Sequence, residues 1–209
     1  MAYQSVWYFT NLPEEIVEIL DKDTLKFFDE NMMSSQVGGN RIWKKKRDSK
    51  NAWIPTTHWI GGFVWHYIMR ANRENFLYDL THIDGESIQY TKYEEGQFYD
   101  WHQDGGLEEY YRPEVVSSKN ENKEESIRNF LNENTECVRK LSFVLQLSDP
   151  DDYEGGNLEL IDESGKRYIA PRKRGTMILF DSRTKHRVNK VTKGCRRSLV
   201  GWTVGPRWR

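Results

Sequence analysis

The sequence is poor in cysteine and has no long apolar run, and each absence excludes a class of protein. Only two cysteines occur among 209 residues, Cys137 and Cys195, in no spacing typical of a metal or redox site. We therefore expect no disulfide framework and a reducing compartment. The N-terminus lacks a charged start followed by an apolar run, and no stretch reaches the length of a membrane span. These absences predict a soluble cytoplasmic protein with no membrane partner.

A bias toward one sign of charge is also missing. The formal net charge is −1, so the whole chain has no electrostatic reason to bind nucleic acid or a membrane surface. One basic run, Lys44-Lys45-Lys46-Arg47, could contact phosphate, but we expect a solvated loop because most such runs are. Aromatic residues, in contrast, are abundant, with eight Trp and eleven Tyr. They favour a β-rich core with a lined pocket and argue against disorder.

Two amphipathic helices are predicted near the N-terminus. The first runs from about Pro13 to Asn31, because Asn11 can cap it and proline suits a first helical turn. The second runs from about Thr57 to Asn75, where apolar side chains recur on one face. We expect a helical part over residues 1–85 within a single domain that spans 1–209.

From residue 86 onward the pattern changes to short strands with tight turns. Strands are predicted over Ser87–Tyr93, Phe98–Asp104, Val138–Leu147, Asn157–Ile161, Lys166–Ala170, Thr176–Phe180, His186–Thr192 and Arg196–Val204. Helices followed by short strands indicate a mainly β fold with α, a β-sandwich or jelly roll over residues 86–209, with the N-terminal helices packed on one sheet.

A polar region from about residue 105 to 136 interrupts these strands. Its Lys, Glu and Asn content contrasts with the apolar strands on both sides. A loop this long inside one domain is usually a functional lid or a flexible insert. We expect a flexible insert with a short helix near Ile127, and we expect the substrate to bind close to it.

A His-x-Asp sequence lies at the end of the second predicted strand. Alternate side chains of an extended strand share a face, so His102 and Asp104 can converge on one metal ion. His186, which follows a buried strand, is the third ligand we expect. Two imidazoles and one carboxylate on one face of a six-coordinate ion leave three positions open, as in non-haem Fe(II) oxygenases.

The other three histidines are not expected to bind metal. His58 and His66 lie on the second predicted helix and have no carboxylate at ligand spacing, so we expect both to be structural. His82 precedes a glycine turn, and we expect it to lie in a loop or at the surface.

Several stretches together resemble one family. The run Tyr93–Asp104 is similar to the proximal motif of the prolyl 4-hydroxylase-like 2-oxoglutarate/Fe(II) dioxygenases, in their bacterial and phage-type branch. Leu147–Leu158 resembles the middle strand and Gly-Gly turn of that family, and Phe180–Arg196 resembles its distal half. The resemblance covers about Ser87–Pro206 and implies a double-stranded β-helix, another name for this jelly roll.

The resemblance also implies roles for individual residues. It implies that the three predicted ligands hold Fe(II) at the catalytic centre. Arg196 follows His186 by ten positions, where the family places the residue that grips the distal carboxylate of 2-oxoglutarate. Arg196 and Ser198 share a strand face, so a guanidinium fork and a hydroxyl can reach one carboxylate. Tyr93 is implied as a further contact to this cosubstrate.

Neighbouring residues qualify this assignment. Prolyl hydroxylases more often carry lysine at the Arg196 position, and Gln146 stands where some relatives place a cosubstrate-binding tyrosine. Arg197 is the rival anchor, but it points to the opposite strand face and we expect a surface arginine. Fe²⁺ with one carboxylate carries +1, 2-oxoglutarate −2 and Arg196 +1, so the filled site is neutral, as a buried site requires. Tyr99 and Trp101 could shape the mouth of the site, but we expect both to be core residues.

The resemblance implies an oxidative reaction. O₂ and 2-oxoglutarate are consumed, succinate and CO₂ are released, and a substrate C–H bond is hydroxylated, with ascorbate as a candidate accessory. The implied substrate is a prolyl or other residue of a peptide or protein. Two alternatives stay open: a nucleic-acid demethylase of the same superfamily, suggested by the Arg-x-Ser sequence and the basic run, and a non-catalytic jelly-roll binding module. The sequence leaves the oligomeric state open.

Overall fold

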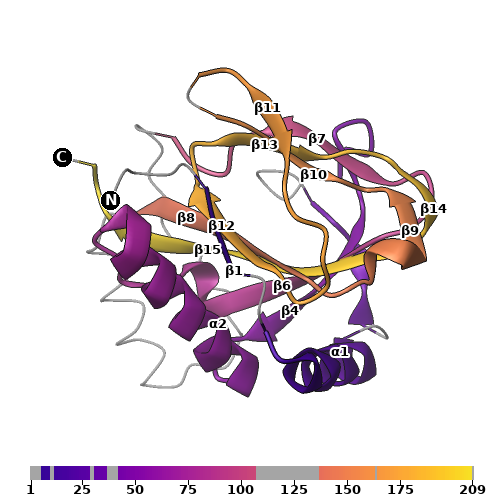
Figure 1. The fold of residues 1–209 in the computed structure, drawn as a ribbon, viewed down its shortest axis with the longest axis horizontal. Helices are drawn as coiled ribbons and strands as arrows, with labels where there is room; N and C mark the ends of the chain where they lie inside the picture. Colours follow the sequence, from indigo (N-terminus) through magenta and orange to yellow (C-terminus); the bar gives the residue numbers. More distant parts are fainter. Residues whose placement is uncertain are drawn as a thin grey trace.

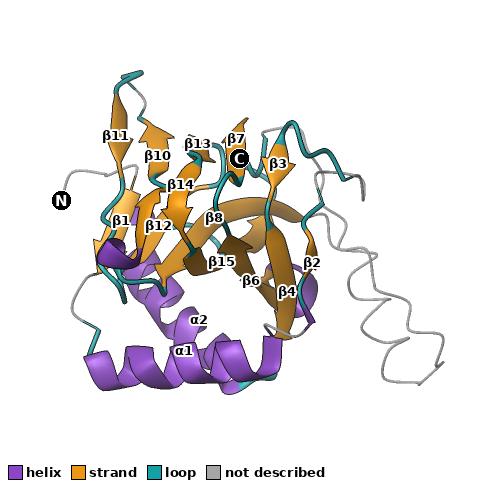
Figure 2. Cartoon of the chain, turned by 90° about the vertical axis from the view of Figure 1, so that its right-hand side faces the viewer, coloured by secondary structure: helices purple, strands orange, loops and turns teal. Residues whose placement is uncertain are grey.

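Two antiparallel sheets face each other, and two helices cover the outer face of the larger sheet (Figure 1 and Figure 2). The structure is a computed structural model that describes residues 6–9, 12–28, 31–36, 42–106, 137–162 and 164–208. The helices are α1 (Glu14–Phe28) and α2 (Trp59–Ala71), and α2 continues into a π-helical turn over Asn72–Phe76. Within the described ranges, no helix combines the length and apolar character that crossing a bilayer requires.

Most of the strands belong to the larger sheet. Its members are β1 (Val6–Phe9), β2 (Met33–Ser34), β4 (Lys50–Pro55), β5 (His82–Ile83), β6 (Ser87–Tyr93), β8 (Cys137–Gln146), β12 (Met177–Asp181) and β15 (Arg196–Pro206). They lie in the order β1-β12-β8-β15-β6-β4-β2, and β5 pairs with the end of β15. The long strands β8 and β15 therefore form the centre of this sheet.

The smaller sheet lies on the side away from the helices (Figure 2). Its members are β3 (Arg47–Asp48), β7 (Phe98–His102), β10 (Leu158–Ile161), β11 (Arg167–Ile169) and β13 (Lys185–Val188), in the order β11-β10-β13-β7-β3. A separate antiparallel pair joins β9 (Tyr153–Gly155) to β14 (Val191–Gly194).

Alternation along the central strands divides the core in two. Phe143 and Leu145 of β8 belong to the buried cluster that includes Ile60 of α2. Val144, between them, belongs to a second cluster with Leu158 of the smaller sheet. Side chains of β8 and β15 that share the face of Val144 therefore point into the space between the sheets, where polar groups are enclosed.

The predicted layering, a jelly roll with helices against one sheet, is confirmed, but the segment before residue 86 is not only helical. It contributes β1 and β4 to the larger sheet and β3 to the smaller one. His82, expected in a loop or at the surface, lies half-buried in the short strand β5. His58 caps α2 by accepting a hydrogen bond from the backbone of Ile60. These strands were not predicted, because they are short, lie at irregular intervals between the helices and give no clear alternating pattern.

The predicted strand His186–Thr192 is wrong in one respect, since it is two strands. β13 pairs with β10 and β7, whereas β14 pairs with β9. At the junction, the side chain of Asn189 accepts from the backbone N–H of Asn157 over 2.8 Å, while the backbone N–H of Asn189 donates to the carbonyl oxygen of Asn157 over 3.0 Å. Most of the predicted insert, residues 107–136, lies outside the described residues, and the single-domain organisation stays a prediction.

Candidate metal centre

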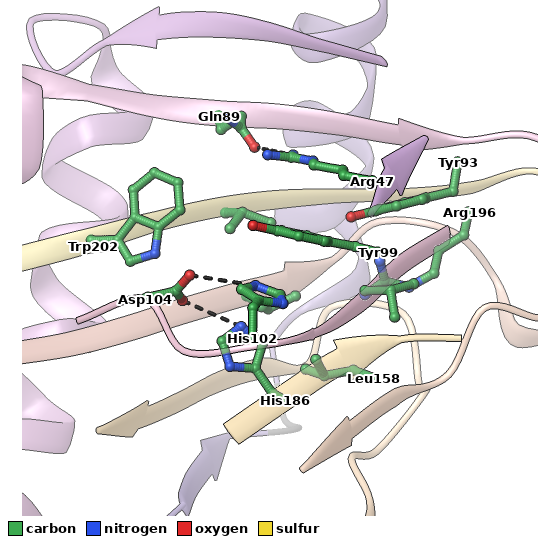
Figure 3. Close-up of a pocket in the computed structure, with 13 residues that line it drawn as sticks. Arg47, Gln89, Tyr93, Tyr99, His102, Asp104, Leu158, His186, Arg196 and Trp202 are labelled. Atoms are coloured by element: carbon green, nitrogen blue, oxygen red, sulfur yellow. Dashed lines mark hydrogen bonds and ion pairs between the residues drawn. The ribbon is translucent and has the colours of Figure 1, made fainter. Parts of the chain in front are cut away.

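His102, Asp104 and His186 come together between the two sheets (Figure 3). His102 ends β7 and lies opposite His186 on β13, while Asp104 follows two residues later. The Nε2 atoms of His102 and His186 lie 3.5 Å from Oδ1 and 3.3 Å from Oδ2 of Asp104. One ligand atom from each residue lies within 4.8 Å of the others, and no second group of this kind occurs in the described part of the chain.

Backbone carbonyl groups hold both imidazole rings. Nδ1 of His102 lies 2.8 Å from the carbonyl oxygen of Asp100, and Nδ1 of His186 lies 2.9 Å from that of Thr184. A carbonyl oxygen can only accept, so each Nδ1 carries the proton and donates it. Each Nε2 then faces Asp104 as a ligand atom. Metal-binding histidines are oriented in this way by the hydrogen bond of their other nitrogen.

Asp104 is positioned by the larger sheet. It does not lie in a strand as predicted, because β7 ends at His102. Its backbone N–H donates to the carbonyl oxygen of Ser182, after β12, over 2.9 Å. The hydroxyl of Ser142, on β8, donates to Oδ2 over 2.7 Å. The carboxylate is thereby aimed across the space between the sheets at the two histidines.

The protonation states suit a divalent cation. Burial raises the pKa of Asp104, but the two imidazoles outweigh it and hold that pKa well below its ordinary value. Burial lowers the pKa of His102, which keeps this ring neutral. Burial also opposes the charged form of His186, but the Asp104 carboxylate outweighs it and raises the pKa of His186. A bound cation would replace the proton shared by this last pair.

These three side chains open into a pocket between the sheets. Besides the three, it is lined by Arg47, Gln89, Tyr93, Tyr99, Val144, Leu158, Val188, Arg196, Val200 and Trp202. Once a cation displaces the proton of His186, two neutral imidazoles and one carboxylate face an open pocket, which fits the facial arrangement of Fe(II) oxygenases. They do not fit a closed structural zinc site, which has four protein ligands.

Arg196 enters the same pocket from β15 and is only 1% exposed. Its Nη2 donates to Oε1 of Gln146 over 2.9 Å, and its Nη1 lies 3.4 Å from the hydroxyl of Ser198. Its Nε is buried with no partner, and no carboxylate pairs with the guanidinium in the described ranges. The ring of Tyr93 lies 5.7 Å away. A buried cation without a counter-ion is the expected environment for an anionic ligand.

The Gly-Gly turn makes room for this arginine. Gly156 has φ of 61°, a conformation that side chains rarely adopt. A Cβ atom there would lie 2.9 Å from Cγ2 of Val191 and 3.2 Å from Cδ of Arg196. The turn therefore does more than join two strands, because it lets Arg196 pass into the pocket.

Arg197 points away from the pocket, as predicted, but the expectation of a surface arginine is wrong. Its Nη2 lies 3.2 Å from Oδ2 of Asp21 on α1, and its side chain is only 18% exposed. Arg174 contacts the same carboxylate over 3.3 Å. The reason is that α1 covers this face of the larger sheet, so Arg197 joins the helix to the sheet.

The prediction of a solvated basic run is also wrong for half of its residues. Lys44 and Lys45 are exposed, but Lys46 donates to the backbone of Trp101, and Arg47 is 7% exposed. Arg47 lies on β3 opposite Tyr99 of β7, and its side chain turns into the pocket. No sequence signal separates it from its three basic neighbours, because the strand that orients it has two residues.

Tyr99 and Trp202 are further pocket residues: for Tyr99 the sequence analysis preferred a core position, and it did not single out Trp202. The phenol of Tyr99, expected in the core, stacks on the ring of His102, and burial raises the pKa of Tyr99 to about 12. Trp202 lies on the same face of β15 as Arg196 and Ser198, and its Nε1 is buried with no hydrogen-bond partner in the part of the chain that the structure describes. The alternation that grouped Arg196 with Ser198 also reaches Trp202, so this residue was within reach of the sequence.

Comparison with known proteins gives a consistent result. A sequence model of the 2OG-Fe(II) oxygenase superfamily matches residues 88–204. A PKHD-type hydroxylase of Janthinobacterium sp. (strain Marseille) is 28% identical over 155 residues, which are 73% of this chain and 59% of that protein. The match thus spans less than two thirds of this relative's length.

Two solved structures share the fold. A Pseudomonas putida prolyl-4-hydroxylase superposes with a TM-score of 0.68 at 17% identity, over 98% of this chain and 94% of that one. A prolyl hydroxylase from Trichoplax adhaerens, solved with a peptide fragment of hypoxia inducible factor, gives a TM-score of 0.71 at 18% identity, over 96% and 84%. At these identities the likeness shows the double-stranded β-helix fold alone.

Proposed function

Because the chain belongs to the 2OG-Fe(II) oxygenase superfamily, we propose that it is an Fe(II)- and 2-oxoglutarate-dependent hydroxylase of a prolyl or other residue in a peptide or protein. The observation that carries the proposal is the joint placement of the two histidines, Asp104 and Arg196 in one pocket. The prolyl hydroxylases among its structural neighbours support an amino-acid residue as the target.

The residues divide the work between metal and cosubstrate. His102, Asp104 and His186 would hold the iron, and Arg196 with Ser198 would hold the distal carboxylate of 2-oxoglutarate. When bound, iron and 2-oxoglutarate supply the oxidising power with which O₂ hydroxylates a C–H bond, and succinate and CO₂ leave. Ascorbate is proposed as an accessory that keeps the iron reduced.

Gln146 has a positioning role in this scheme. Its Oε1 accepts from Nη2 of Arg196, and its Nε2 donates to the carbonyl oxygen of Pro171 over 3.2 Å. The amide is therefore held at both ends and fixes the guanidinium plane. Where some relatives present a tyrosine hydroxyl to the cosubstrate, this chain uses the glutamine to orient the arginine.

Apolar and aromatic residues would shield the reacting atoms. Val144 and Val200 from the larger sheet face Leu158 and Val188 from the smaller one across the pocket. They keep water from the carboxylate end of the cosubstrate and strengthen its pairing with Arg196, because charges interact more strongly where water is excluded.

The experiment that tests the proposal is an anaerobic titration with Fe(II) and 2-oxoglutarate, followed by succinate release in air. The wild-type protein should develop the visible charge-transfer band of the chelate, and peptides that contain a target residue should stimulate succinate release. His186→Ala should lose both signals, whereas His66→Ala, a change at an exposed histidine of α2, should keep both. A missing band in the wild type, or a band that survives in His186→Ala, contradicts the proposal.

The alternatives have distinct outcomes in the same assay. A nucleic-acid demethylase would respond to methylated oligonucleotides instead of peptides, and the inward positions of Lys46 and Arg47 weaken the basic run that suggested it. A non-catalytic binding module would bind peptide without releasing succinate above background.

A further inference from the structure

Arg47 is a second buried cation in the pocket, and the proposed chemistry does not use it. Its Nε donates to the hydroxyl of Ser49 over 3.0 Å, its Nη1 to the carbonyl oxygen of Gln36 over 3.3 Å, and its Nη2 to Oε1 of Gln89 over 2.7 Å. All these acceptors are neutral. A guanidinium has five N–H donors, so two of them, one on each Nη, have no partner among the described residues and remain for a ligand.

The groups around Arg47 are donors as well. Oε1 of Gln89 accepts from both Arg47 and Thr91, so the amide can present only its N–H groups to the pocket. Nε1 of Trp202 is a buried donor that has no hydrogen-bond partner among the described residues. Figure 3 shows Gln89, Arg47 and Trp202 around one part of the pocket, above the metal ligands. A lining of donors with few acceptors is suited to an anion.

The net charge of the site, once iron and 2-oxoglutarate are bound, also favours an anionic ligand beside Arg47. Iron, Asp104, 2-oxoglutarate and Arg196 together are neutral, so the buried guanidinium of Arg47 leaves an excess of one positive charge. A buried charge without a partner is costly, and one negative charge on the substrate would balance it. The half-buried guanidinium of Arg139, which donates to the backbone of Asp104, adds no further charge, because it is already paired with Asp84 over 2.8 Å.

The position of Arg47 relates this anion to the reacting bond. Its guanidinium lies 4.7 Å from the ring centroid of Tyr99, and the other face of that ring is stacked on His102 (Figure 3). Only one aromatic ring therefore separates Arg47 from a metal ligand. A group bound by Arg47 belongs to the part of the substrate next to the hydroxylated carbon.

We propose that Arg47 is a specificity-determining residue that binds a carboxylate of the substrate, adjacent to the residue that is hydroxylated. This inference rests on the proposed function, since it names the substrate class of the same site. The carboxylate comes from an Asp or Glu side chain or from the free C-terminus of a peptide. Arg47 and the amide of Gln89 hold it together, and Arg196 is left for the cosubstrate.

The test is isothermal titration of the anaerobic complex of protein, Fe(II) and 2-oxoglutarate with matched peptides. One pair is acetyl-Ala-Pro-Asp-Ala-amide and its Asn counterpart, and a second is acetyl-Ala-Pro with a free or an amidated C-terminus. The wild type should bind the carboxylate member of at least one pair about tenfold more tightly, and the pair that responds identifies the source of the carboxylate. The amides should bind with similar affinity in all variants.

Two variants remove the proposed contact in different ways. Arg47→Met deletes the guanidinium, whereas Gln89→Glu leaves it on Tyr99 and neutralises it with a carboxylate from the protein itself. Both should abolish the tenfold preference, and the second keeps the result interpretable if the first fails to fold. Lys45→Met, a loss of one charge from the exposed part of the same basic run, should leave the preference unchanged.

Several results would overturn the inference. They are equal binding of the two members of both pairs, no binding of any carboxylate peptide, or a loss in Arg47→Met that affects carboxylates and amides alike. A short single-stranded oligonucleotide that binds more tightly than every peptide and is weakened by Arg47→Met would assign the site to nucleic-acid phosphate instead. The charge-transfer band should form in the wild type and persist in Arg47→Met. A wild type without the band contradicts the proposed function, whereas a wild type with the band but without a carboxylate preference contradicts only this inference.

Discussion

The phenol ring of Tyr99 is stacked on the imidazole of His102, with ring centroids 3.6 Å apart and planes inclined by 16°. The guanidinium of Arg47 lies on the other side of Tyr99, so three planar groups from β3 and β7 support one another. His102 cannot turn away from Asp104 without displacing the phenol. The aromatic ring thus holds a metal ligand in place before any ion binds, as a preorganised site requires.

Removal of the Tyr99 ring should therefore weaken metal binding. Tyr99→Ala is expected to lower Fe(II) affinity about tenfold, a typical effect of losing a group that orients a ligand. Tyr99→Phe keeps the stack and should bind Fe(II) as the wild type does. Anaerobic titration of the charge-transfer band measures both, with Tyr8→Ala, at an exposed tyrosine, as the control. If Tyr99→Phe were as weak as Tyr99→Ala, the hydroxyl and not the stack would be responsible.

The hydroxyl of Ser142 should matter for the same reason. Its hydrogen bond to Oδ2 of Asp104 orients the carboxylate, so Ser142→Ala should reduce Fe(II) affinity about 10–100-fold while the protein remains folded. Thr203→Val is the matched control, because Thr203 contacts β8 at Leu141 on the opposite face of the sheet. Equal Fe(II) affinity in the wild type and Ser142→Ala would show that Asp104 is held by its backbone alone.

Arg196 and Arg197 are adjacent and should have separable roles. Arg196→Lys keeps the positive charge but loses the planar fork, and the affinity for 2-oxoglutarate should fall about tenfold or more. Arg197→Lys should leave that affinity unchanged, since its side chain contacts α1. Titration of 2-oxoglutarate into the anaerobic Fe(II) protein measures both. If the affinity for 2-oxoglutarate fell more in Arg197→Lys than in Arg196→Lys, Arg197 and not Arg196 would be the residue that binds the cosubstrate.

The contact between Arg197 and Asp21 should contribute to stability. Arg197→Ala leaves Asp21 partly buried with Arg174 as its remaining partner, and the free energy of unfolding should fall by about 1–3 kcal/mol, the usual cost of removing one partner of a buried polar group. Urea unfolding gives the value, and Lys193→Ala, at an exposed ion pair, is the control. An unchanged unfolding midpoint in Arg197→Ala would mean that α1 is held by apolar contacts alone.

Asp181 should make stability depend on pH at the acid end. Burial raises the pKa of Asp181, but hydrogen bonds from Arg183 and Tyr78 outweigh it and lower that pKa below its ordinary value. A carboxyl with a lowered pKa in the folded state stabilises fully above its unfolded value of about 3.9 and loses this contribution as the pH falls further. Asp181→Asn should therefore be less stable than the wild type at pH 7.

The difference between Asp181→Asn and the wild type should narrow as the pH falls below about 4, because the carboxyl of the unfolded chain is protonated there first and that of the folded protein at a lower pH. Urea unfolding at several pH values measures it. Glu154→Gln, at an exposed ion pair, is the matched control and should show little difference at any pH. If the difference in the free energy of unfolding between Asp181→Asn and the wild type stayed constant at every pH, the loss of stability would result from packing and not from the charge of Asp181.

The local pattern of apolar and polar side chains was enough to predict most of the secondary structure. The helices and most strands follow from periodicity, because side chains that share a face recur every 3.6 or 2 residues. The same alternation placed Arg196 and Ser198 together and Arg197 opposite, and the structure shows both faces as predicted. His102, Asp104 and His186 were grouped by their chemistry and by a family resemblance, and the structure brings them within ligand distance of one another.

Alternation says which side chains share a face but not what covers that face. The sequence by itself therefore determined the two layers, the three metal-capable residues and the direction of Arg196. Only the tertiary structure decided that α1 lies over Arg197, and that a two-residue strand brings Arg47 beside Tyr99, 52 positions later in the chain. Both outcomes depend on contacts between segments far apart in sequence, which no local periodicity encodes.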